Sequence, residues 1–132
     1  MKVSPDTNVL VRAVVRDDQK QGRQAAKLLK EAEIIAISLP CLCEFVWVLR
    51  RVYKFGQKDI ATALTALINA SNVVVNRPAV DAGLAIHNSG GDFADGLIAY
   101  EGSWLGGETF VSFDKKAVTL ITQAGQQAKM LG

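Results

Sequence analysis

The chain has 132 residues, of which 49% are hydrophobic and 21% charged, and its formal net charge is +2. The length fits one ordinary domain, and the composition excludes a disordered, collagen-like or low-complexity chain. The most apolar stretch, residues 34–49, is shorter than the ~20 residues that span a bilayer, and Pro40 and Glu44 interrupt it. Asp6 and Arg12 stand where an export signal needs an unbroken apolar segment, so we expect a cytoplasmic protein.

Short apolar runs alternate with longer segments of helical periodicity, which predicts an α/β fold. In the first part of the chain we expect strands at residues 2–5, 34–37 and 73–75, and helices at residues 9–15, 40–52 and 60–68. A further helix follows Asp17 or Asp18, either of which can cap it, and Asn8 can cap the first helix. We expect Gly56 to end the helix that Pro40 opens.

The second part of the chain continues the same alternation. A helix is expected at residues 78–87, and Asp92 caps another that runs to about Leu105. A strand at residues 109–113, a helix at residues 115–123 and a short edge strand at residues 127–131 complete the chain. With no repeat and no linker, residues 1–132 are expected to form one domain, a three-layer α/β/α fold with a central, mostly parallel sheet.

Four acidic residues occupy equivalent places around the expected sheet. Asp6 follows the first strand, and Asp114 follows the strand that ends at Phe113. Glu44 lies one turn into the helix after the second strand, and Asp95 lies in the first turn of the helix after Asp92. Because the carboxyl ends of parallel strands and the starts of the following helices share one edge, all four acids can converge there.

Each acid also has a simpler structural explanation. Glu44 is the only charged residue among residues 34–49, so we expect a carboxylate in a buried helix that needs a metal or a distant base, although a thin exposed stripe would also accommodate it. Asp92 and Asp95 have the spacing of a capping box, and we assign Asp92 mainly to the cap and Asp95 mainly to a metal. Asp6 and Asp114 alone would fit turns or helix caps.

Carboxylates without nearby His or Cys select hard cations, so this set predicts Mg²⁺ or Mn²⁺. Four acids have room for two ions about 4 Å apart, which stabilise the attacking and leaving oxygens of a phosphodiester displacement. Thr7 and Ser112 are candidates to orient water or a phosphate oxygen. The lone His87, expected to be a partly buried packing residue, excludes a two-imidazole ribonuclease and a multi-His zinc site.

The remaining chemistry-bearing residues give weaker signals. Fifteen Lys and Arg stand against thirteen acids, and setting the four site acids aside leaves nine, a basic surplus of six that suits a polyanionic partner or an ordinary solvated surface. Cys41 and Cys43 are two residues apart on a helix, where their side chains point to different faces and cannot easily bond, so both are expected to be small core residues. Trp47 and Trp104 are expected in the core, and a dimer contact or an antitoxin groove are the alternatives.

Four segments, taken in order, resemble the PIN-domain family and most of all its VapC toxins, the ribonuclease halves of type II toxin–antitoxin pairs. They are DTNVLVR at residues 6–12, EFVWVL at residues 44–49, DFADGLIA at residues 92–99 and SFD at residues 112–114. The resemblance spans nearly the whole chain. It implies a parallel-sheet α/β/α fold and a Mg²⁺- or Mn²⁺-dependent endoribonuclease that cleaves structured RNA such as transfer or ribosomal RNA.

The resemblance also implies a homodimer and inhibition by a small, VapB-like antitoxin. By position, the residues that match the acidic metal site are Asp6, Glu44, Asp95 and Asp114, with Asn8 and Ser112 as supporting polar residues and Asp92 as a further metal candidate. Candidates to contact RNA or an antitoxin are Arg12, Arg16, Arg50, Arg51 and Lys54. Ser4 and Pro5 depart from the family pattern, which has apolar strand residues there.

Other functions fit the length and class. A receiver-type signalling domain would place a lysine such as Lys115 or Lys116 near its acids, but Asn76 and Arg77 follow the middle strand where it needs a phosphorylatable Asp. A phosphatase with Asp6 as nucleophile would form an aspartyl-phosphate and usually needs a longer chain. The third alternative is a non-catalytic binding module in which the acids are structural.

Overall fold

The structure, a computed structural model, describes residues 1–132, which form two compact units. Unit 1 is Met1–Asn76 and unit 2 is Arg77–Gly132, and each is described by itself. The strands pair within each unit, three in unit 1 and two in unit 2, and every pairing is parallel. The predicted α/β class with parallel strands is therefore confirmed.

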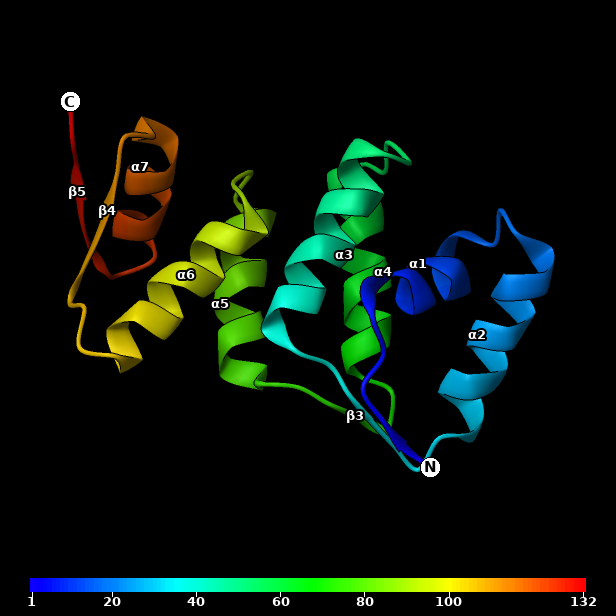
Figure 1. Cartoon of the computed structure of the whole chain (residues 1–132). Coiled ribbons are helices and arrows are strands. Elements are labelled where there is room, and N and C mark those ends of the chain that lie inside the picture. The colour runs from blue at the N-terminus through cyan, green and yellow to red at the C-terminus, as the bar shows by residue number, and fades with distance from the viewer. The chain divides into compact units, whose positions relative to one another are not determined.

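Unit 1 contains a three-stranded parallel sheet with the strand order β1-β2-β3 (Figure 1). A pair of helices connects each strand to the next along the chain. Its elements are β1 Lys2–Val3, α1 Thr7–Val15, α2 Gln19–Glu31, β2 Ile34–Ala36, α3 Leu39–Arg51, α4 Gln57–Ile68 and β3 Val73–Val74. Lys2 pairs with Ile34, and Ile35 pairs with Val73. All three strand ends therefore face the same way, as the acidic-site hypothesis for Asp6 requires.

The core of unit 1 consists of apolar side chains from its helices and from β2. Its fully buried members include Leu10, Leu42, Phe45, Leu49, Ile60 and Leu64. In α3 they recur at spacings of three and four residues, which is the pattern of a helix with one buried face. This packing holds α1 and α3 in place, and the candidate acids of unit 1 lie at the start of α1 (Asp6) and in the second turn of α3 (Glu44).

Three predicted boundaries in unit 1 are wrong. β1 ends at Val3, so Ser4 and Pro5 separate it from Asp6. Helix α1 begins at Thr7 with Asp6 as its N-cap, so Asn8 lies inside the helix. Gly56 does not end α3, which stops at Arg51. Gly56 is instead the N-cap residue of α4.

Unit 2 consists of two packed helices followed by a strand–helix–strand segment. Its elements are α5 Arg77–Asn88, α6 Phe93–Trp104, β4 Thr109–Ser112, α7 Lys115–Gln123 and β5 Gln127–Met130. β4 and β5 pair in parallel, from Thr109 with Gln127 to Ser112 with Met130. The short edge strand predicted at the end of the chain is therefore confirmed. A small core joins Ile86, Ala99 and Ile121, with Phe110, Leu120 and Ala128 packed against it.

Glycines let α5 and α6 approach closely. A Cβ built on Gly96 would lie 2.5 Å from the carbonyl oxygen of Ala82, and one on Gly83 would lie 2.7 Å from Cε1 of Phe93. Both distances are shorter than real Cβ contacts, so only glycine fits at these positions. Gly96 follows Asp95, so this close contact fixes the turn of α6 that carries a candidate metal ligand.

The placement of both tryptophans in the core is wrong. Trp47 is 59% exposed and Trp104 is 76% exposed. Trp47 lies on the solvent face of α3, and Trp104 is the last residue of α6, where its ring centroid lies 6.4 Å from that of Tyr100. Helix periodicity alone could not show which face of α3 the core covers.

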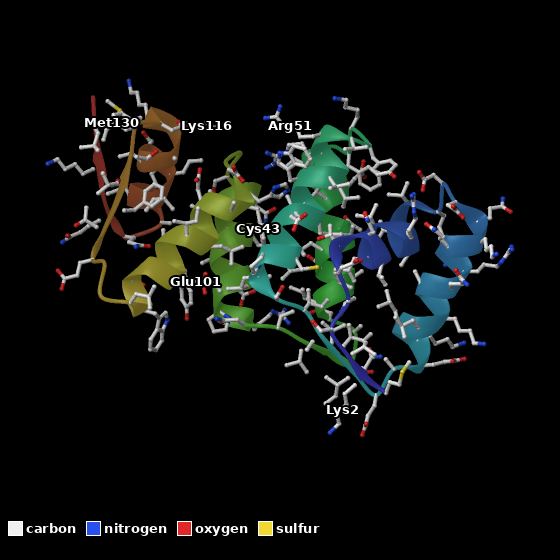
Figure 2. The ribbon with its side chains drawn as sticks, in the orientation of Figure 1. Lys2, Cys43, Arg51, Glu101, Lys116 and Met130 are labelled. Atoms are coloured by element: carbon white, nitrogen blue, oxygen red, sulfur yellow. The ribbon has the colours of Figure 1, made fainter.

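The predictions for three other single residues are confirmed in part. His87 is a packing residue, as expected, but it is 1% exposed and so more fully buried than expected. Cys41 is buried, as expected of a small core residue, whereas Cys43 is only half-buried on α3 (Figure 2), and the two form no disulfide. None of the helices combines the length and the hydropathy needed to cross a bilayer.

The α5–α6 contact predicts opposite effects for two glycine substitutions in the same helix. Gly96→Ala should lower the free energy of unfolding by about 1–3 kcal/mol, because its Cβ overpacks against the backbone of Ala82. Gly102→Ala, with no atom within 4 Å of its Cβ position, should raise it by about 0.5–1 kcal/mol. Urea denaturation measures both, and equal destabilisation by the two variants would contradict the packing account.

Candidate functional site

Asp6 stands at the start of α1, where the chain turns from β1 into the helix. Its backbone is extended, and its Oδ1 accepts a hydrogen bond from the amide of Val9 at 3.2 Å. This is N-capping, which fixes the carboxylate beside the positive end of the helix dipole. The structural alternative considered for Asp6 is thus realised, and the same contact holds the exposed carboxylate in a defined place.

Glu44 occupies a different environment from the one expected. It is exposed, so the expectation of a costly buried carboxylate is wrong. The solvent face of α3 runs through Pro40, Glu44, Trp47 and Arg51, at spacings of four, three and four residues. Arg51, at the C-terminal end of this stripe, is seen in Figure 2. Glu44 therefore needs no partner to offset a cost of burial. What it can do depends on the residues around the start of α3.

The buried thiol of Cys41 joins α3, which carries Glu44, to the residues on either side of Asp6. Its Sγ donates to the carbonyl oxygen of Pro5 at 3.6 Å and accepts from Thr7 Oγ1 at 3.8 Å. Burial raises the pKa of Cys41, and the charges of Glu44 and Asp6 raise it further. Both carboxylates are therefore within electrostatic reach of this thiol, whose hydrogen bonds join α3 to the start of α1.

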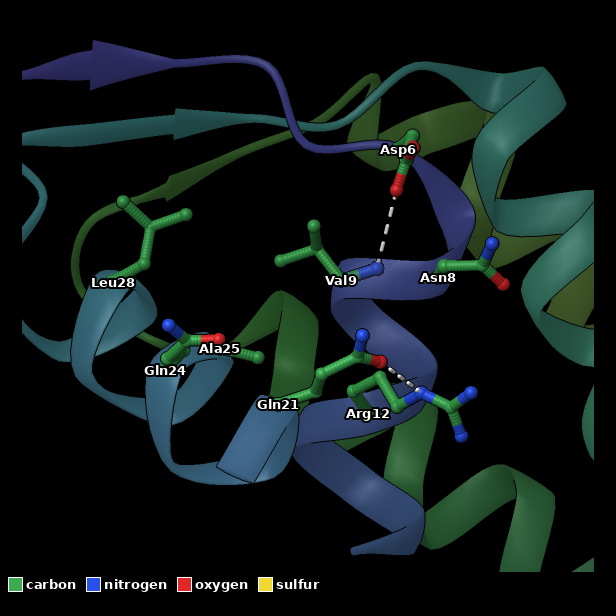
Figure 3. A pocket seen from close by; sticks show the side chains of 8 residues that line it. All are labelled: Asp6, Asn8, Val9, Arg12, Gln21, Gln24, Ala25 and Leu28. Atoms are coloured by element: carbon green, nitrogen blue, oxygen red, sulfur yellow. Dashed lines mark hydrogen bonds between the residues drawn. The ribbon is translucent and has the colours of Figure 1, made fainter. Parts of the chain in front are cut away.

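A pocket of about 350 Å³ lies beside Asp6, between α1 and α2 (Figure 3). Its lining consists of Asp6, Asn8, Val9, Arg12, Gln21, Gln24, Ala25 and Leu28. The α2 residues of this lining, Gln21, Gln24, Ala25 and Leu28, were not predicted as site residues from the sequence. Their spacing of three and four residues on α2 was the available signal, but nothing local shows that this face of α2 packs along α1.

Arg12 lines the pocket but is already engaged. Its Nε donates to Gln21 Oε1 at 2.8 Å, and its Nη1 donates to Asp17 Oδ1 at 2.8 Å. Asp17 also accepts a hydrogen bond from the Tyr53 hydroxyl at 2.9 Å, and this bond together with that from Arg12 lowers the pKa of Asp17. Arg12 therefore positions Gln21 at one wall of the pocket, and its hydrogen bonds to Gln21 and Asp17 take the place of a phosphate contact.

The acids of unit 2 gather at the starts of two helices. Asp92 caps α6 by accepting from the amide of Ala94 at 3.0 Å, as predicted. Asp114 caps α7 by accepting from the amides of Lys116 and Ala117 at 2.9 and 3.3 Å. The hydroxyl of Ser112 accepts from the amide of Asp114 at 3.0 Å, so Ser112 shapes the turn that presents this acid.

Asp95 is the half-buried member of the unit 2 group. Burial raises its pKa, and the negative charges of Asp92 and Asp114 raise it further. The three carboxylates therefore lie within electrostatic reach of one another. A divalent cation relieves this kind of repulsion, and carboxylate oxygens are its preferred ligands.

The structure thus brings the predicted acids together as two groups. Asp6 and Glu44 belong to unit 1, and Asp92, Asp95 and Asp114 belong to unit 2. No group of three or more His, Cys, Asp or Glu side chains is arranged to hold a metal ion in the structure. The ion pairs Arg12–Asp17 and Arg77–Asp81 involve none of these five acids.

Comparison with known proteins adds one match. The profile of the PIN domain matches residues 3–118, which include all five acids and parts of both units. No curated protein matches the chain.

The environment of Asp95 predicts a stabilising substitution. Because its pKa is raised above the ordinary value of 3.8, the ionised carboxylate destabilises the folded state at neutral pH. Asp95→Asn should therefore raise the melting temperature at pH 7 in metal-free buffer, and this gain should disappear as the pH falls below about 3.8. Thermal melts across this pH range measure it.

Asp59→Asn provides the matched control. Asp59 is exposed in the first turn of α4, where its charge stabilises the helix dipole. Its replacement should lower the melting temperature slightly at pH 7. A loss of stability in Asp95→Asn comparable to that in Asp59→Asn would show that Asp95 is an ordinary helix-start acid.

Proposed function

Since the chain belongs to the PIN domain family, we propose that it is a divalent-metal-dependent endoribonuclease and the toxin of a type II toxin–antitoxin pair. PIN domains are generally nucleases that use divalent metal ions. The profile match crosses both units, so we propose that residues 1–132 form a single nuclease domain. The single observation that carries the proposal is this match over residues that include every predicted acid.

The donor set of both acid groups fits Mg²⁺ or Mn²⁺. Asp6 and Glu44 offer exposed carboxylates, and Asp95 is held among like charges that a cation would relieve. We assign metal binding to Asp6, Glu44, Asp95 and Asp114, with Asp92 as a further candidate. When bound, the metal lowers the pKa of water and stabilises charge on the phosphate and the leaving 3′ oxygen.

The protein's own contribution is to hold its acids in place before RNA arrives. Asp6, Asp92 and Asp114 are each fixed by backbone amides at a helix start. Ser112 fixes the turn before Asp114, while the Thr7 hydroxyl bonds to Cys41. Preorganisation of this kind avoids reorganising charged side chains during the reaction.

The substrate and the partners are proposed from the resemblance and from charge. Fifteen Lys and Arg residues suit a polyanion, and the toxin-like motifs favour structured RNA such as transfer or ribosomal RNA. A homodimer in the cytoplasm, neutralised by a VapB-like antitoxin, completes the proposal. Arg16, Arg50, Arg51 and Lys54 remain candidates to contact RNA or the antitoxin.

Substitution of Asp6 separates its capping role from metal binding. Asparagine caps helices as well as aspartate does, so Asp6→Asn should fold normally but cleave RNA at least roughly a hundredfold more slowly in Mn²⁺. Asp18→Asn is the matched control, because Asp18 caps α2 through the amide of Gln21 at 2.9 Å. Cleavage of purified transfer RNA, followed on denaturing gels, measures both variants.

Glu44 provides a second, independent test of the same site. Glu44→Gln should lose cleavage to a similar extent, whereas Glu31→Gln, at the exposed end of α2, should retain it. Wild-type cleavage by both Asp6→Asn and Glu44→Gln in clean preparations would overturn the proposed function. Equal loss in the two control variants would point to general damage instead.

A further inference from the structure

We propose that the pocket between α1 and α2 holds the base of one nucleotide of a single-stranded RNA segment, and that the basic face of α2 holds the neighbouring phosphates. This inference rests on the proposed function and deepens it, because it gives the RNA a defined position next to Asp6. All the residues that carry it belong to unit 1.

The pocket has the surfaces that a nucleobase needs. Val9, Ala25 and Leu28 supply an apolar wall, and the amides of Gln21 and Gln24 stand across from Asp6 in Figure 3. A volume of about 350 Å³ falls in the range of small-ligand sites, which combine apolar walls with a few polar groups. A base offers matching features, a flat apolar face and a polar edge.

The polar edge of the pocket is preorganised. Arginine can only donate, so its 2.8 Å contact fixes the oxygen of the Gln21 amide towards Arg12 and leaves the NH₂ group to donate elsewhere. Asp17 holds Arg12, and Tyr53 holds Asp17. This network links Tyr53, just after α3, to Gln21 on α2 through Asp17 and Arg12. The Arg12 side chain therefore orients the Gln21 amide.

Helix α2 carries a basic stripe next to the pocket. Its members, Lys20, Arg23, Lys27 and Lys30, recur at spacings of three, four and three residues, and all are exposed. Gln24 lies four residues after Lys20 and three before Lys27, so the pocket edge and the stripe are neighbours on the helix surface. Only Glu31, at its last position, gives α2 a negative charge.

Together these features favour a single-stranded nucleic acid over an acidic peptide, and the proposed function makes that nucleic acid RNA. A row of positive charges suits any polyanion, including an acidic peptide, but an acidic peptide has no use for a base-sized pocket with an amide edge. A single RNA strand uses both, because its phosphates and its unstacked bases are available together. The sequence-based candidates for RNA contact did not include this stripe.

The phosphate part is tested by binding without cleavage. Affinity for a short fluorescent single-stranded RNA is measured by anisotropy in EDTA, for wild type and for Lys20→Gln with Lys27→Gln. Loss of two phosphate contacts should weaken binding roughly tenfold and reduce the slope of log affinity against log salt by about 1.4. The matched control, Lys58→Gln with Lys129→Gln, removes two exposed charges elsewhere and should change neither value much.

The base part is tested with an RNA in which one base at a time is removed. Wild-type protein should lose about threefold to tenfold in affinity at one abasic position, the worth of one or two hydrogen bonds and a base contact. Gln24→Ala removes one polar group of the pocket and leaves its apolar wall, so it should bind the intact RNA more weakly than wild type and show a smaller penalty at the same abasic position. Gln123→Ala, exposed at the end of α7, should behave like wild type.

The results that overturn the inference differ from those that overturn the proposed function. Equal binding by the Lys20/Lys27 and Lys58/Lys129 variants, or a penalty for the abasic RNA that is undiminished in Gln24→Ala, would overturn the α2 subsite even if the enzyme cleaves RNA. Competition by an acidic peptide with no abasic penalty would assign the stripe to a protein partner. RNA binding with the expected pattern but no cleavage in Mn²⁺ would leave the subsite standing and overturn the nuclease.

Discussion

N-capping is the interaction on which the candidate site depends. Asp6, Asp92 and Asp114 each accept hydrogen bonds from amides in the first turn of α1, α6 and α7. The bonds fix each carboxylate at the positive end of a helix dipole, where its charge is stabilised. Each of these three residues therefore serves both the fold and the candidate site. The start of the helix that it caps determines where its carboxylate lies.

Packing adds a second constraint around Asp95 and Cys41. In unit 2, the glycine contact between α5 and α6 fixes the turn that carries Asp95 beside the cap at Asp92. In unit 1, Cys41 is buried against Pro5 and Thr7, so the start of α1 is tied to α3. In unit 2 the packing holds Asp95 near Asp92 and Asp114 despite the repulsion between their charges, and a bound cation would remove that cost.

The sequence predicted the features that local chemistry determines. Asp92 as a cap, the helix at residues 115–123 and the β-branched strand before Asp114 all follow from short polar or β-branched residues at particular positions. The predicted burial of Glu44 failed because α3 is apolar enough to look buried on every side, while the fold covers only one of its faces.

Features that depend on distant residues were not predictable. The contact of Cys41 with Pro5 joins positions 36 residues apart, and the need for glycine at position 96 arises from the backbone of Ala82 on another helix. The pocket beside Asp6 likewise exists only because α1 and α2 pack together. Tertiary contact, rather than local propensity, decides such features.

The central claim is that both acid groups bind a divalent metal, and paramagnetic broadening of amide NMR signals by Mn²⁺ tests it most directly. The account predicts that signals of residues 6–9 and 44 broaden at the same Mn²⁺ concentrations as those of residues 92–95 and 114–117. Broadening restricted to one group, or absent from both at millimolar metal, would contradict it.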